Sequence, residues 1–125
     1  MRTPLIVLAE DNHELRALLA SALENVGYEV VQVETGNELV DLVRRMIDEG
    51  EPPRLIITDV RMPNMDGLAA ARILRARGDI PPLIFMTAYG DAWSHAQAGE
   101  LGAVLLEKPL SIETLRQAVR RAIPP

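Results

Sequence analysis

The chain has 125 residues, of which 48% are hydrophobic and 25% charged, and it is long enough to bury one core without disulfides or metals to hold it. The 18 acidic residues outnumber the 13 basic ones, and the net charge of −5 argues against nucleic acid as the direct partner. The absence of cysteine excludes a disulfide framework and a thiolate metal site. We therefore expect one domain over residues 1–125.

The first residues do not form a targeting segment. The apolar run Leu5–Ala9 is too short for a signal peptide and is followed by two acids. No apolar run approaches the ~20 residues that a bilayer requires. We expect a cytoplasmic protein.

Short apolar runs alternate along the chain with longer stretches of helical spacing. In chain order, the runs predict strands at residues 5–9, 30–33, 55–58, 82–86 and 104–106. The stretches predict helices from Leu15 to near Gly27, from Thr35 to Gly50, from Gly67 to Gly78, over 93–98, and from a Ser111 cap to Ile123. Five buried strands interleaved with five helices indicate an α/β fold, a parallel sheet covered on both faces.

Polar side chains follow four of the five predicted strands. Glu10 and Asp11 follow the first strand, Asp59 the third, Thr87 the fourth and Lys108 the fifth, whereas the second adds no obvious group. Ligands of open parallel sheets bind at the carboxyl ends of the strands, so we expect these side chains to share one site.

Lys108 is the single lysine of the chain, and the other twelve basic residues are arginines. Lysine presents a compact charge that can reach one phosphoryl oxygen, whereas arginine presents a planar fork. Chance in an arginine-rich sequence is the alternative interpretation of the lysine taken alone. Its place at a strand end beside the predicted acids favours a functional group.

Three carboxylates at one edge repel each other unless a cation neutralises them. Oxygen ligands without histidine or cysteine favour a hard ion, Mg²⁺ first. Mg²⁺ binds phosphates, and a carboxylate beside it can become an aspartyl phosphate. Thr87 and Lys108 would then bind the phosphoryl oxygens.

The segment from Asp59 to Gly67 resembles the phosphoacceptor loop of receiver domains in two-component response regulators. The family pattern is Asp, two residues, Met-Pro, one residue, Met-Asp-Gly, and every fixed position is present. The resemblance covers the whole chain, including Glu10-Asp11, Thr87-Ala88 and Lys108-Pro109. It implies a flavodoxin-like (CheY-like) doubly wound fold, a five-stranded parallel sheet in the order 2-1-3-4-5 with five helices.

The resemblance also implies roles for single residues. Asp59 is the expected acceptor of a phosphoryl group from a sensor histidine kinase or a histidine phosphotransfer protein. Asp11, Asp59 and the backbone carbonyl of Arg61 are the expected Mg²⁺ ligands, and Glu10 supports them through water. Thr87 resembles the switch hydroxyl.

Lys108 resembles the phosphate-binding lysine of the family, and its bond to Pro109 is expected to be cis. The family usually carries a switching Tyr or Phe where this chain has Leu105, so we consider Tyr89 or Trp93 as replacements for that aromatic residue. Glu10 stands where Asp is commoner.

The resemblance implies a stand-alone receiver in a phosphorelay, without an output domain. Phosphorylation would switch its binding to an unknown protein target, through the face of the fourth helix, fifth strand and fifth helix. Such a module is not an enzyme beyond its own phosphoryl uptake and slow autodephosphorylation, and it needs no direct contact with nucleic acid or membrane.

Other interpretations remain for the fold and for single residues. A phosphatase with an aspartyl intermediate would need a second acid two residues after Asp59, where Arg61 stands, and a cap domain. A dinucleotide-binding domain would need glycines after the first strand, and a degenerate receiver would lack one of the site residues. Each site residue taken by itself also has an alternative without a functional role. Asp11 could cap a helix, Asp59 could cap a turn, and Thr87 could be a hydrogen-bonded hydroxyl at the end of a strand.

Overall fold

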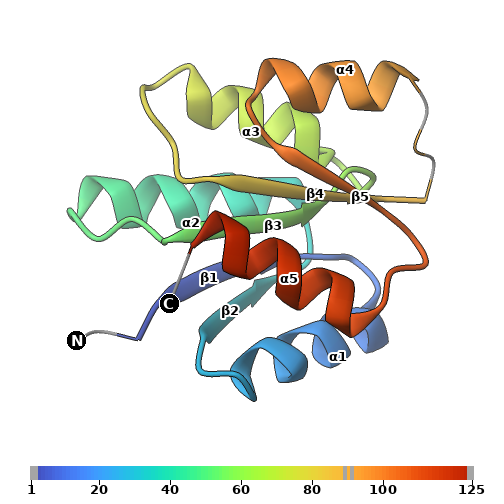
Figure 1. Ribbon diagram of the computed structural model, residues 1–125. Coiled ribbons are helices and arrows are strands. Elements are labelled where there is room, and N and C mark those ends of the chain that lie inside the picture. Colours follow the sequence, from blue (N-terminus) through green and yellow to red (C-terminus); the bar gives the residue numbers. More distant parts are fainter. Residues whose placement is uncertain (1–2, 89, 91, 124–125) are drawn as a thin grey trace.

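Strands and helices alternate along the chain in the computed structural model, which describes residues 3–88, 90 and 92–123 (Figure 1). The strands are β1 (Leu5–Ala9), β2 (Glu29–Val33), β3 (Leu55–Asp59), β4 (Leu83–Thr87) and β5 (Val104–Glu107). The helices are α1 (His13–Glu24), α2 (Gly36–Asp48), α3 (Gly67–Arg75), α4 (Ala92–Glu100) and α5 (Ile112–Ala122).

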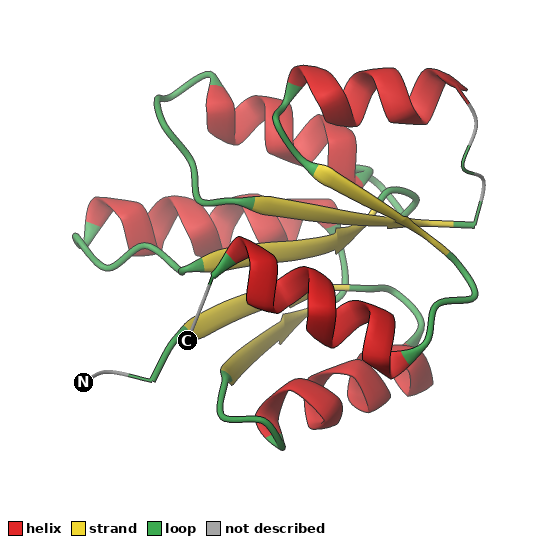
Figure 2. Cartoon of the chain, viewed as in Figure 1, coloured by secondary structure: helices red, strands yellow, loops and turns green. Residues whose placement is uncertain are grey.

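The five strands form one parallel sheet in the order β2-β1-β3-β4-β5. This confirms the predicted doubly wound α/β fold. The direction of strand addition reverses between β1 and β3, so the loops after these two strands lead to opposite faces and leave a crevice between them. Figure 2 shows the loops that leave the carboxyl ends of the strands along one edge of the sheet.

Two helical layers cover the sheet. Helices α1 and α5 lie on one face, and α2, α3 and α4 lie on the other (Figure 1). Alternate residues of β1 enter the two cores: Ile6 and Leu8 pack with α1 and α5, and Val7 and Ala9 pack with the opposite helices. Because both faces of β1, β3 and β4 are buried, these three central strands are nearly continuous apolar runs and do not alternate with polar residues.

Most predicted element boundaries differ from the structure by one to three residues. Strand β4 begins at Leu83 instead of Pro82, because proline has no N–H for the sheet ladder, although its carbonyl accepts from Ile56. Asp59 is itself the last residue of β3. Helix α3 ends at Arg75, three residues before Gly78, and α4 is longer than predicted.

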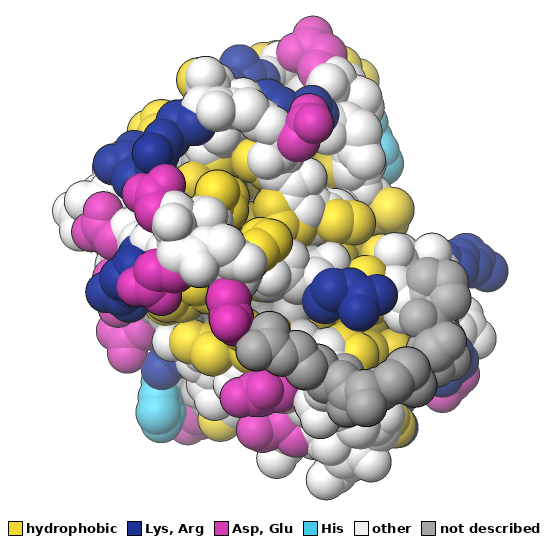
Figure 3. Space-filling view, turned by 90° about the vertical axis from the view of Figure 1, so that its left-hand side faces the viewer, with side chains coloured by type: hydrophobic (Ala, Val, Ile, Leu, Met, Phe, Trp, Pro, Cys, Tyr) yellow, Lys and Arg dark blue, Asp and Glu magenta, His cyan; other side chains and the backbone are white. Residues whose placement is uncertain are grey.

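The edge of the sheet where the strands begin carries acidic and basic side chains intermixed, with small hydrophobic patches between them (Figure 3). No helix of the described residues has the length and apolarity needed to span a bilayer.

Gly67 lets the start of α3 pack directly against the end of β3. A Cβ at this position would lie 2.2 Å from the main-chain oxygen of Asp59 and 2.9 Å from Thr58 Oγ1. Asp66 caps the helix by accepting from the backbone N–H of Ala69 at 2.7 Å. The Asp-Gly pair of the loop therefore starts α3 where it meets the candidate phosphoacceptor.

We expect Gly67→Ala to lower the free energy of unfolding by about 1–3 kcal/mol, because the added methyl forces the backbone of Asp59 or of α3 to move. Urea unfolding measures the change. The matched control is Gly99→Ala in α4, where a Cβ meets nothing within 4 Å and helix propensity favours alanine by about 0.5–1 kcal/mol. Equal stability of Gly67→Ala and the parent would contradict the steric account.

Candidate functional site

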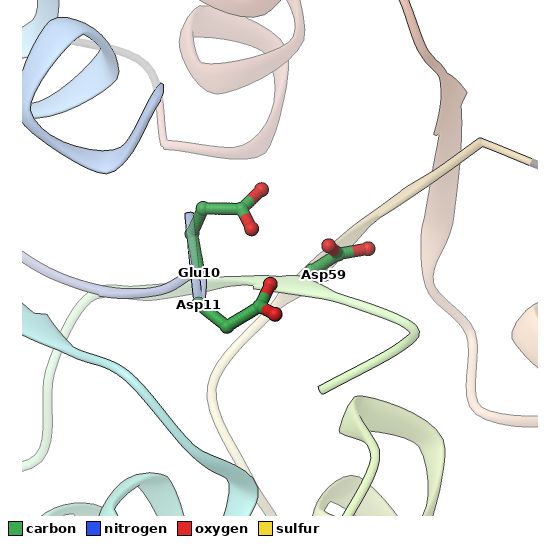
Figure 4. A group of neighbouring side chains, drawn as sticks. All are labelled: Glu10, Asp11 and Asp59. Atoms are coloured by element: carbon green, nitrogen blue, oxygen red, sulfur yellow. The ribbon is translucent and has the colours of Figure 1, made fainter. Parts of the chain in front are cut away.

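Three carboxylates meet at the carboxyl edge of the sheet. Oxygen atoms of Glu10, Asp11 and Asp59 all lie within 4.8 Å of one another. Figure 4 shows them gathered between the loop after β1, which carries Glu10 and Asp11, and the end of β3, which carries Asp59. Glu10 is completely buried and Asp59 is 6% exposed, whereas Asp11 is exposed. The structure thus brings together the three acids that the strand ends predicted.

Lys108 joins two of these acids. Its Nζ donates to Glu10 Oε1 at 2.6 Å and to Asp59 Oδ2 at 2.9 Å. Its backbone N–H donates to the carbonyl of Thr87 at 2.7 Å, and its bond to Pro109 is cis, as predicted. Burial lowers the pKa of Lys108, but the hydrogen bonds and charges of Glu10 and Asp59 outweigh that effect and raise the pKa above the ordinary lysine value.

The third carboxylate, that of Asp11, lies in an environment that disfavours its charged form. Burial raises the pKa of Asp11, and so do its hydrogen bond with Glu10 and the negative charge of Glu10. The backbone hydrogen bond of Asp11 and the charge of Lys108 act in the opposite direction and do not cancel the rise. One ammonium leaves two negative charges uncompensated among these four side chains, an electrostatic cost that a further cation at the site would relieve.

The donor set fits Mg²⁺, because it consists of carboxylate oxygens without histidine or cysteine. Both carboxylate oxygens of Glu10 have protein partners, since Oε2 accepts from the backbone N–H of Asn12 at 3.1 Å and Oε1 accepts from Lys108. This agrees with the predicted supporting position of Glu10, but Asp59 Oδ2 also accepts from Lys108, at 2.9 Å. Direct ligation by Asp11 and Asp59 stays a prediction. The backbone N–H of Arg61 lies 3.4 Å from Asp59 Oδ1, and the ligation by its carbonyl stays a prediction.

Thr87 is the last residue of β4 and is 1% exposed. In the ladder it lies opposite Glu107, and the residue before it, Met86, lies opposite Asp59. Thr87 is therefore one residue further along β4 than Met86, which lies opposite the candidate phosphoacceptor Asp59. Its switching role stays a prediction.

One helix cap and a buried arginine lie next to the acids. Asn12, not Asp11, caps α1, because its Oδ1 accepts from the backbone N–H of Leu15 at 2.9 Å. Arg16 is 6% exposed, and its Nη1 donates to the main-chain oxygen of Glu10 at 2.9 Å. Arg16 is not among the residues predicted for the site, although its position three residues before Leu19 puts it on the apolar face of α1.

The structure describes the position of the missing aromatic switch, Leu105, and one of its two candidate replacements, Trp93. Leu105 is partly buried against the core on the face of α2, α3 and α4. Trp93 on α4 is 60% exposed. Tyr89 lies outside the described residues.

A family model for the response regulator receiver domain matches residues 6–120. The chain belongs to this family. It is therefore a receiver domain of the kind found in two-component systems, in which such domains serve as phosphoacceptor modules.

Curated relatives of this receiver differ in length. Sporulation initiation phosphotransferase F of Bacillus subtilis is 30% identical over 120 residues, which are 95% of this chain and 93% of that protein. The DNA-binding transcriptional regulator NtrC of Klebsiella pneumoniae is 33% identical over 117 residues, 93% of this chain but 24% of that protein. The absence of an output domain stays a prediction.

Solved receiver structures share the fold over nearly the whole chain. The non-phosphorylated HemR receiver domain from Leptospira biflexa is 28% identical with a TM-score of 0.87, covering 98% of this chain and 95% of that one. The signal receiver domain of a signal transduction histidine kinase from Syntrophus aciditrophicus is 32% identical with a TM-score of 0.80, covering 96% and 89%.

We expect Lys108→Met to lower the free energy of unfolding in Mg²⁺-free buffer by about 3 kcal/mol, because it leaves two buried carboxylates without their cation. If the acids bind Mg²⁺ as predicted, the added ion should recover part of this loss, because the site exists only in the folded receiver. Urea unfolding with and without Mg²⁺ measures both effects.

The control is Arg77→Met, which breaks the exposed pair of Arg77 and Asp48 at 3.2 Å and is expected to cost less than about 1 kcal/mol. A Lys108→Met receiver as stable as the parent without Mg²⁺ would show that the bridge contributes nothing.

Proposed function

We propose that this receiver is a Mg²⁺-dependent switch in which Asp59 accepts a phosphoryl group from a phosphohistidine of a sensor kinase or phosphotransfer protein. The observation that carries the proposal is the pair of buried acids joined by Lys108, with Asp11 beside them. The similarity to a protein named sporulation initiation phosphotransferase F supports a place in phosphoryl transfer.

The chemistry needs only groups that the strand ends present. A carboxylate oxygen of Asp59 attacks phosphorus, the P–N bond of the phosphohistidine breaks, and the histidine nitrogen keeps the electron pair. Mg²⁺ held by Asp11, Asp59 and the carbonyl of Arg61 would neutralise charge on the phosphoryl oxygens. The ammonium of Lys108 lies 2.9 Å from Asp59 Oδ2. It would form an ion pair with the phosphoryl oxygens once the group is on Asp59. The hydroxyl of Thr87 would donate a hydrogen bond to another phosphoryl oxygen.

A phosphatase with an aspartyl intermediate is the second candidate function from the sequence. Position 61, two residues after Asp59, is arginine and cannot supply the second acid that such enzymes use. We therefore propose a switch whose catalysis is limited to its own phosphoryl uptake and slow hydrolysis. Multiple turnover on a small phosphomonoester would favour the phosphatase.

We expect Asp59→Asn to take up no phosphoryl group from acetyl phosphate and Mg²⁺, because an amide oxygen is a poor nucleophile. Intact-protein mass spectrometry detects the adduct on the parent. The control is Asp66→Asn in the same loop, where asparagine can still accept from the N–H of Ala69 and cap α3. Uptake by Asp59→Asn equal to that of the parent would overturn the assignment of the acceptor.

An apolar hollow of about 350 Å³ adjoins the site and is our candidate dock for the histidine-bearing partner. Its lining includes Lys108 and four apolar residues, which are Leu15, Ala88, Pro109 and Leu110. Leu18 lies one helical turn after Leu15 on α1 and is 53% exposed. A helix seated on this surface would bring its phosphohistidine next to Asp59.

We expect Leu18→Glu to slow phosphotransfer from a histidine kinase about tenfold, since a charge in an apolar dock costs binding energy. Uptake from acetyl phosphate should stay unchanged, because no protein docks in that reaction. The control is Val26→Glu, an equally apolar and 46% exposed position beyond the end of α1. Equal kinase rates for the two variants would contradict the dock.

The output contact is proposed for the face of α4, β5 and α5. β5 is an edge strand of the sheet, and edge strands offer unpaired backbone groups to partners. A hollow of about 230 Å³ lies between β5 and α5, and Val104 at its margin is 47% exposed. The downstream protein and the cytoplasmic location of the encounter stay predictions.

A further inference from the structure

Three charged side chains are buried among the described residues, namely Glu10, Arg16 and Asp59. Glu10 and Asp59 belong to the acidic site. Arg16 lies on α1, outside the set of residues to which the proposed function gives a role, yet it contacts the chain segment that carries two of the three acids. A buried charge is costly, so its contacts need an account.

The guanidinium of Arg16 holds three segments together. Its Nη1 donates to the main-chain oxygen of Glu10 at 2.9 Å, after β1. Its Nη2 donates to Glu34 Oε1 at 3.1 Å and its Nε to Gln32 Oε1 at 3.3 Å, at the end of β2. Nη2 also lies 3.0 Å from Nδ1 of His13, in the first turn of α1. These contacts converge on the carbonyl of a residue whose side chain belongs to the site.

Glu10 is held at each of its polar groups. Its backbone N–H donates to the carbonyl of Val33 at 3.1 Å, and its carbonyl accepts from Arg16. Its two carboxylate oxygens accept from Lys108 and from the backbone N–H of Asn12. Loss of Arg16 would therefore free the carbonyl end of this residue and the peptide that leads to Asp11.

We propose that Arg16 is a positioning residue of the acidic site. By holding the Glu10 carbonyl against the end of β2, it sets where the carboxylates of Glu10 and Asp11 stand relative to Asp59. The acids repel one another at 4.8 Å or less, so the loop needs an anchor that does not itself occupy the space between them. Arg16 supplies this anchor from behind the loop. The consequence for Mg²⁺ binding rests on the proposed function.

The direction of the change in Mg²⁺ affinity distinguishes a positioning role of Arg16 from a purely electrostatic role and from a purely structural one. Removal of a positive charge near an acidic site should by electrostatics alone strengthen the binding of a divalent cation. Loss of a purely structural strut should lower stability and leave the Mg²⁺ affinity of the folded protein unchanged. Loss of a positioning residue should weaken Mg²⁺ binding, and residues that hold metal ligands in place typically contribute about 10- to 100-fold in affinity.

The experiment compares Arg16→Met and Arg16→Lys with the parent and with Arg116→Met. Arg116 is a matched control because it is partly buried and, like Arg16, donates to a main-chain oxygen. Its Nε and Nη2 donate to the carbonyl of Ala22 at 3.2 and 2.9 Å. Calorimetric Mg²⁺ titration gives the dissociation constant, and urea unfolding gives stability. The amide NMR signal of Asn12, recorded without Mg²⁺, reports the geometry at the Glu10 carboxylate.

We expect Arg16→Met to weaken Mg²⁺ binding by about tenfold or more and to shift the Asn12 amide signal. Arg16→Lys keeps the charge but loses the planar fork, so it should show the same losses to a smaller degree. Arg116→Met should lose stability and keep both the affinity and the Asn12 signal.

Unchanged or tighter Mg²⁺ binding by the folded Arg16 variants, with an unmoved Asn12 signal, would overturn the inference. If Arg16→Met does not fold, Arg16→Lys decides by the same criteria. A parent that binds no Mg²⁺ and takes up no phosphoryl group would overturn the proposed function as well. If the parent binds Mg²⁺ and takes up the phosphoryl group, and the Arg16 variants behave identically to it, only the inference about Arg16 is overturned.

Discussion

The bridge from Lys108 to Glu10 and Asp59 is the interaction on which the site depends. Two carboxylates buried at 0% and 6% exposure would be strongly destabilising without a cation, and the ammonium supplies that cation at 2.6 and 2.9 Å. The three side chains come from three strand ends, so the sheet must form before they can meet. The negative charge that Lys108 leaves uncompensated among the three acids is what a cation such as Mg²⁺ would neutralise.

The parallel sheet makes this arrangement possible because it places all carboxyl ends of its strands along one edge. The central strands β1, β3 and β4 are largely apolar and buried on both faces, so the charged groups collect where the strands stop. Local backbone chemistry then sets the loops. Asn12 and Asp66 cap the helices that follow β1 and β3, and Gly67 allows α3 to start against the carbonyl of Asp59.

The residue pattern predicted the five strands and the residue types at their ends, and the family pattern around Asp59 predicted the strand order. Local patterns were insufficient where a neighbouring residue decides the outcome. Pro82 belongs to an apolar run, but its missing N–H excludes it from the ladder. Asp11 and Asn12 are both good caps, and the structure shows that Asn12 makes the bond. Arg16 gave no local signal of function, because its partners Gln32 on β2 and Glu34 just after it are 16 and 18 residues away.

The sequence by itself determined the fold class, the acids and lysine at the strand ends, and the loop that follows the candidate phosphoacceptor. These follow from periodicity, composition and local motifs, which act over a few residues. Only the tertiary structure decided that Lys108 bridges Glu10 and Asp59, and that Arg16 holds the loop from behind. Such contacts join residues up to 98 positions apart, and their partners are chosen by the register and packing of the whole sheet.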